Sequence, residues 1–145
     1  MIAPEQRFAQ PIRGHAYRPL TRVLAVTIAL ATLAYGASVA GRGDGVAGAL
    51  LFMVISAGLV MVFACWYIVM GRTTIDARGV HQDWIMAKSY GWGEIRSARI
   101  LRLPLSTRLM LNTGRPPFKV IQSGTPEITA AFEEIVAFYT SKARS

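Results

Sequence analysis

The chain has 145 residues, of which 52% are hydrophobic and only 17% are charged, and its formal net charge is +8. About a quarter of the residues are charged in an ordinary soluble domain, so this composition disfavours a purely soluble fold. The length allows one domain, and the single cysteine, Cys65, excludes an intramolecular disulfide and a cysteine-based metal site.

The first half of the chain contains two uncharged stretches, one between Arg22 and Arg42 and one between Asp44 and Arg72. Each is long enough to cross a bilayer core, which takes roughly 20 helical residues. A buried helix of a soluble protein usually stops at about 10 to 14 apolar residues, so that alternative is disfavoured. The predicted transmembrane helices cover about residues 21–40 and 46–70, within a hairpin at residues 20–71.

The uneven distribution of basic residues predicts the topology. Residues 1–22 contain four arginines and one glutamate, whereas residues 72–145 contain eleven basic and six acidic side chains. Lys and Arg near the ends of a span stay in the cytoplasm, so both termini are expected on the cytoplasmic side of the membrane. A signal peptide cleaved after Ala40 is the alternative, but the apolar stretch exceeds the usual core of about 7 to 15 residues.

Residues 1–19 are expected to form a cytoplasmic arm outside any domain. Pro4, Pro11 and Pro19 restrict the backbone there and disfavour a continuous helix. The arginines and aromatic residues of this arm are suited to anionic headgroups, although a disordered tail is the preferred interpretation.

The first predicted transmembrane helix carries small side chains spaced by three and four residues, which places them on one face. Such a stripe favours close approach of a second helix in lipid. The glycine-rich segment 41–45 predicts a tight turn and therefore antiparallel helices. Neither span contains an ionisable side chain, which disfavours a channel or transporter. The candidate helix-packing residues are Ala25, Ala29, Thr32, Gly36 and Ala40.

Residues 72–145 consist of short extended segments separated by turns and followed by one helix. Thr125, Pro126 and Glu127 start that helix as N-cap, first-turn proline and first-turn acid. We predict a small β-barrel or half-barrel capped by this C-terminal amphipathic helix. The predicted strands lie at about residues 72–77, 80–86, 89–92, 97–103, 107–112 and 118–121.

Two short motifs make this region similar to a known class of domain. Residues 76–80 (DARGV) and 90–95 (YGWGEI) resemble the turn and the tryptophan box of bacterial pleckstrin-homology-like (PH-like) domains that follow transmembrane hairpins. The resemblance covers roughly residues 72–141. It implies an α+β membrane protein whose PH-like barrel or half-barrel is used for interaction and not for catalysis.

A group of basic side chains is the main candidate binding surface of this domain. Beneath a membrane, it would meet the negative inner leaflet or an acidic partner, and solubilising charge explains it about equally well. Nucleic acid is disfavoured, because Trp84 and Trp92 are expected in the core and no stacking platform remains. The candidate residues are Arg96, Arg99, Arg102, Arg108, Arg115 and Lys119.

The sequence predicts no catalytic residue, metal ion or cofactor. His81, Asp83 and Glu94 come nearest to an acid–base group, but no positioned Ser or Cys nucleophile accompanies them. Neither His15 nor His81 has a second ligand at a spacing that would normally form a zinc site.

The predicted function is that of a membrane-anchored, non-enzymatic interaction or scaffold protein, with a PH-like domain at residues 72–145 on the cytoplasmic face. That domain is expected to bind a protein partner, a second copy of the chain or anionic lipid headgroups, and neither nucleic acid nor a small-molecule substrate. The alternative is an accessory or assembly subunit that docks into a larger inner-membrane complex through its hairpin.

Overall fold

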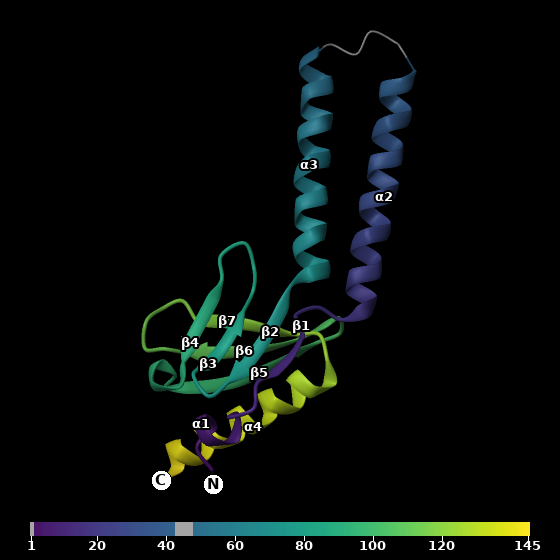
Figure 1. Cartoon of the computed structure of the whole chain (residues 1–145). Coiled ribbons are helices and arrows are strands. Elements are labelled where there is room, and N and C mark those ends of the chain that lie inside the picture. The colour runs from purple at the N-terminus through teal and green to yellow at the C-terminus, as the bar shows by residue number, and fades with distance from the viewer. Residues whose placement is uncertain (1, 43–47) are drawn as a thin grey trace.

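The computed structural model of the protein describes residues 2–42 and 48–145. Two long helices, α2 (Pro19–Gly41) and α3 (Gly48–Met70), lie side by side and project from one end of a β domain (Figure 1). Both are long and apolar enough to cross a membrane, with mean hydropathies of 2.0 and 2.5. The expected turn between them lies mostly outside the described residues.

The β domain contains two antiparallel sheets and a C-terminal helix. The turn and alternation patterns predicted short strands followed by this helix. A single 3-10 turn, η1 (Trp92–Glu94), connects the sheets. Sheet A has the strand order β1 (Ile12–His15), β2 (Arg72–Asp76), β3 (Gly79–Gln82) and β4 (Lys88–Gly91). Sheet B has the order β5 (Ser97–Leu103), β6 (Ser106–Asn112) and β7 (Lys119–Ser123), and α4 (Pro126–Arg144) follows.

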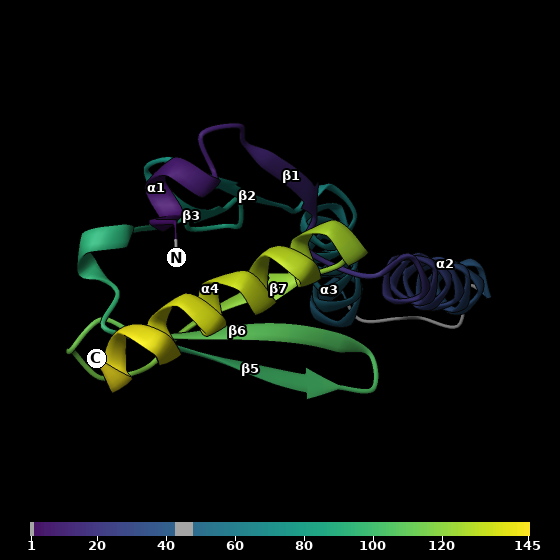
Figure 2. The same ribbon diagram turned by 90° about the horizontal axis from the view of Figure 1, so that it is seen from below.

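The predicted barrel is not closed, because the two sheets remain separate. They meet where β2 approaches β7, and there the Thr73 hydroxyl donates a 2.7 Å hydrogen bond to the Gln122 carbonyl. Helix α4 covers the face of sheet B that is turned away from α2 and α3 (Figures 1 and 2). It also contacts β1 and β2 and so covers the core on the side away from α2 and α3 (Figure 1).

Helix α4 confirms the predicted N-cap and apolar face. The Thr125 hydroxyl accepts a hydrogen bond from the Ile128 amide, and Pro126 occupies the first turn. Tyr139 is buried among the core residues, and its hydroxyl donates a 2.9 Å hydrogen bond to the Trp92 carbonyl. Burial raises the pKa of the Tyr139 phenol, which keeps this donor protonated. The helix residues buried in the core are Ile128, Ala131, Phe132, Ile135 and Tyr139.

The expectation of a disordered N-terminal arm is wrong. Residues 4–7 form the short helix α1 (Pro4–Arg7), and β1 pairs with β2 in an antiparallel register that includes Ile12 opposite Ile75. Phe8 is only 2% exposed and stacks on the Trp92 ring, with 5.7 Å between ring centroids. The arm is ordered because β1 pairs with β2 and Phe8 packs in the core. Short-range sequence patterns do not reveal this order, since those partners lie beyond the two helices in the chain.

The two long helices are therefore inserted between neighbouring strands of one sheet. At their base, His15 pairs with Arg72, and the Ala16 amide donates a 3.0 Å hydrogen bond to the Gly71 carbonyl. Sheet A fixes the start of α2 and the end of α3 at a constant separation. This constraint orients the β domain relative to both helices.

Replacing Phe8 with alanine tests whether the arm stabilises the domain. We expect Phe8→Ala to lower the free energy of unfolding by about 3 kcal/mol, because it leaves a cavity beside Trp92. Denaturant unfolding in detergent, followed by tryptophan fluorescence, measures this loss. The control is Gln6→Ala on the exposed side of α1, and equal stability of the two variants would contradict an ordered arm.

Candidate interaction site

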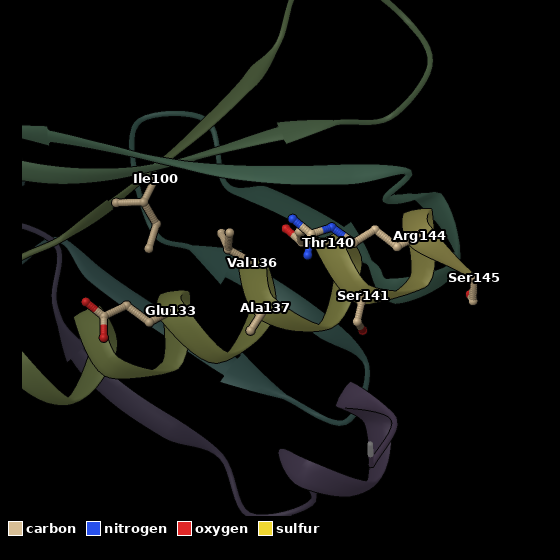
Figure 3. A pocket seen from close by; sticks show the side chains of 8 residues that line it. All are labelled: Ile100, Glu133, Val136, Ala137, Thr140, Ser141, Arg144 and Ser145. Atoms are coloured by element: carbon tan, nitrogen blue, oxygen red, sulfur yellow. The ribbon is translucent and has the colours of Figure 1, made fainter.

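A wide groove lies on the surface of the β domain between strand β5 and helix α4. It consists of two adjoining hollows of about 630 and 770 Å³, which share Ile100, Val136 and Thr140. Figure 3 shows the first hollow, with Ile100 projecting from the sheet toward Val136 on the helix. The floor is apolar and both walls are regular secondary structure, so the groove is a preformed surface.

The groove follows an open strand edge. Strand β5 pairs with β6 on one side only, and no other strand of the described residues lies on its second side. Its seven residues present an edge about 23 Å long. Backbone groups on such an edge are free to pair with another extended chain.

Charged side chains surround this apolar floor. Arg102 forms a 2.5 Å ion pair with Glu133 across the groove, and Arg99 and Arg144 lie at its margins. The Arg102 and Glu133 side chains are 70% and 52% exposed, so water screens their pair, which adds little stability. Arginine exceeds acid around the groove, and this favours an acidic occupant.

The six basic residues predicted as a candidate surface do not form one patch. Arg99 and Arg102 are separated by three positions on β5 and project from opposite faces of sheet B. Arg108 is half-buried on the face away from α4, and Arg96 lies against Gly114. Arg115 lies in the loop before β7, and Lys119 begins that strand. Only Arg99 and Arg102 of this set reach the groove.

The predicted helix-packing stripe lies partly between the two long helices. Ala29 is 6% exposed, and Gly36 faces Val54 of α3. Ala25 and Ala29 also line an apolar groove of about 670 Å³ between α2 and α3. Thr32 donates a hydrogen bond to the Ile28 carbonyl within its own helix, and Ala40 is exposed. Part of the stripe therefore serves contacts within the chain.

A polar cluster of Asp76, His81 and Ser89 joins three strands of sheet A. His81 lies directly opposite Ser89, and its Nδ1 is 2.7 Å from the Ser89 hydroxyl. Its Nε2 is 3.1 Å from Asp76 Oδ1. Asp83 and Glu94, the carboxylates that were weighed with His81 as an acid–base group and disfavoured, lie elsewhere, in the β3–β4 loop and in η1. The cross-strand register instead places Asp76 and Ser89 next to His81. This register was not predicted from the sequence.

This cluster stabilises the β2–β3 turn. Asp76 Oδ1 accepts hydrogen bonds from the amides of Arg78 and Gly79 as well as its contact with His81. Burial alone would raise the pKa of Asp76, but the Arg78 amide, the His81 ring and the Gly79 amide together lower it. Gly79 has a φ of 155°, and a side chain there would collide with the Tyr90 carbonyl. The contacts of Asp76 therefore serve to stabilise the β2–β3 turn.

The two tryptophans of the β domain differ in environment. Trp92 is 6% exposed, as expected for a core residue. Trp84 was also expected in the core, but it is 39% exposed, because β3 ends at Gln82 and Trp84 lies in the following loop. Among the described residues, no three His, Cys, Asp or Glu side chains are close enough to hold a metal ion.

Comparison with known proteins identifies no relative: no protein-family model, curated protein or solved structure matches the chain. The fold and surfaces described above therefore carry the functional argument.

Acid titration tests the role of Asp76. Its folded pKa lies below the unfolded value of 3.8, so its charge stabilises the fold above that value and this contribution is lost as the pH falls through the folded pKa. We expect the stability difference between wild type and Asp76→Asn to be constant above about pH 5 and to shrink below pH 3.8. Denaturant unfolding at each pH measures it.

The Ser89→Ala variant is the control for this titration. It removes one contact of the His81 ring without changing a carboxylate, so the acid-dependent loss should remain. An unchanged stability difference between wild type and Asp76→Asn across the acidic range would contradict a role for the Asp76 charge.

Proposed function

We propose that this protein is a membrane-anchored interaction protein in which a hairpin of two transmembrane helices holds a PH-like domain at the cytoplasmic face of the bacterial inner membrane. The domain binds a protein partner in the groove between β5 and α4. The observation that carries this proposal is an open strand edge beside an apolar groove, on a domain that two apolar helices hold at a fixed orientation.

The surface of the two helices supports their insertion in lipid. Phe52 is 71% exposed, Leu59 is 67% exposed and Val60 is 69% exposed. Contiguous apolar surface of this extent is unfavourable in water. Four arginines precede or begin α2, and the turn region contains one, so the positive-inside rule favours cytoplasmic termini.

The arrangement of sheets supports the PH-like assignment. Four strands in the order β1 to β4, three strands in the order β5 to β7 and a C-terminal helix follow one another in the chain. The sequence resemblance covers this region from β2 onward but not β1. In this assignment the hairpin occupies the connection between the first two strands of the domain.

The groove is suited to a partner segment in an extended conformation. Such a segment would add a strand to β5, gaining backbone hydrogen bonds, and would place alternate side chains against Ile100 and Val136. Arg99, Arg102 and Arg144 favour acidic residues in that segment. Helix α4 covers the face of sheet B away from α2 and α3 (Figure 1). With the helices in the membrane, the groove beside α4 would therefore face the cytoplasm.

Reporter fusions test the predicted topology. A reporter that is active only in the cytoplasm should be active when fused after Ser145 and inactive when inserted after Arg42. A periplasmic reporter should give the opposite result at both positions, since two spans return the chain to its starting side. A periplasmic C-terminus would contradict the proposed placement of the groove.

Filling the groove tests the proposed partner site. Thr140 is exposed and lines both hollows, so Thr140→Trp should occupy the groove without changing the core. We expect mild-detergent co-purification with a tagged chain to recover about tenfold less partner, the equivalent of one lost hot spot. The control is Ala130→Trp on the same helix outside the groove, which should retain the partner.

A second candidate function is docking of the hairpin into a larger membrane complex. It is favoured by the apolar groove between α2 and α3, which small residues such as Ala57 and Ala64 line. A partner that remains with Thr140→Trp and is lost from Ala64→Leu would support this second function and contradict the first.

A further inference from the structure

The β3–β4 loop, residues 83–87, exposes three consecutive large apolar side chains. Trp84 is 39% exposed, Ile85 is 59% exposed and Met86 is 80% exposed. A loop in water normally carries polar residues at its tip, so a run of this kind indicates a surface that is covered in use. Trp84 was expected in the core, but none of the three side chains belongs to the buried core of the fold.

Strand register fixes the direction of this loop. β2 begins at Arg72, directly after α3 ends at Met70, and β3 runs antiparallel to β2 with Gln82 opposite Thr73. The next amide, that of Asp83, donates a 2.9 Å hydrogen bond to the Arg72 carbonyl. The loop therefore leaves sheet A at the end of its strands where α3 leads into β2. Figure 1 shows it rising beside the lower end of α3.

A second turn reaches the same side of the domain. Thr21, in the first turn of α2, donates a 3.4 Å hydrogen bond to the carbonyl of Leu105, which lies in the β5–β6 connection. The Leu105 side chain is 52% exposed. The β5–β6 turn and the β3–β4 loop thus both lie at the end of the domain from which the helices leave.

The cations around the loop match the charge of a lipid surface. The Lys88 ammonium lies 5.0 Å from the centroid of the Trp84 ring, and Arg72 is exposed at the start of β2. An amphipathic tryptophan beside lysine and arginine is typical of the interfacial layer of a bilayer. Anionic headgroups attract such cations, while the apolar side chains enter the acyl boundary.

We infer that the β3–β4 loop inserts Trp84, Ile85 and Met86 into the same leaflet that α2 and α3 leave, as a third point of membrane attachment. This inference rests on the proposed membrane insertion of the two helices and adds a lipid contact to the β domain itself. The occupant of the apolar surface is the anionic leaflet, because the strand register places the loop beside the end of α3 and its neighbouring cations match anionic headgroups.

Spin labels at single cysteines test the inference in reconstituted full-length protein. In a Cys65→Ser background, Met86→Cys reports the loop, Ala137→Cys reports the exposed side of α4, and Leu59→Cys reports the middle of α3. The vesicles contain phosphatidylcholine and phosphatidylglycerol. Collision rates with oxygen, which partitions into lipid, and with a water-soluble nickel chelate give the depth of each label.

We expect labels at positions 86 and 59 to collide preferentially with oxygen, with an oxygen-to-nickel ratio at 86 several times that at 137. A label at 59 in lipid together with a label at 86 as accessible to nickel as that at 137 would overturn the inference and leave the proposed function intact. Shielding of position 86 from both reagents would also overturn it, because protein would then cover the loop. A water-exposed label at 59 would overturn both proposals.

Discussion

The pairing of β1 with β2 is the interaction on which the rest of this structure depends. These strands are adjacent in sheet A but are separated in the chain by both long helices. The pairing draws the base of the helices together and makes the N-terminal segment part of the core, where Phe8 contacts Trp92. It also sets the orientation of every other surface, because the remaining strands follow from β2 by short connections and local register.

That orientation gives the β domain two sides with different surfaces. The side next to the helices carries the β3–β4 loop and the β5–β6 turn, whose exposed side chains are apolar and whose neighbours are cationic. The opposite side carries α4 and its groove with β5. Lipid and protein are competing explanations for basic patches in a membrane protein, and the proposed partner site and the inferred lipid contact use separate surfaces of this domain.

Features encoded by nearby residues could be predicted from the sequence. The bounds of β5 were predicted correctly, as was the Thr125 cap of α4, because alternation and capping are local properties. β1 was missed because it has four residues and its partner lies beyond the hairpin. Alternation also extended the second predicted strand to Met86, whereas pairing with β4 ends β3 at Gln82. The groove was not predicted, although Arg99 and Arg102 belong to the predicted basic surface, because the placement of Ile100 beside Val136 depends on how α4 crosses the sheet.

The position of the two chain ends determines when the domain can fold during synthesis. Arg7 pairs with Glu134 and Phe8 packs in the same core as Phe132 of α4, so the first and last segments complete one structure. Strand β1 is made before either helix, but its partner β2 appears only after both have left the ribosome. In the proposed membrane arrangement, the helices enter the bilayer while the core is incomplete, and the domain closes only after α4 is released. Insertion of the two helices would then precede closure of the core and bring β1 and β2 within reach of each other.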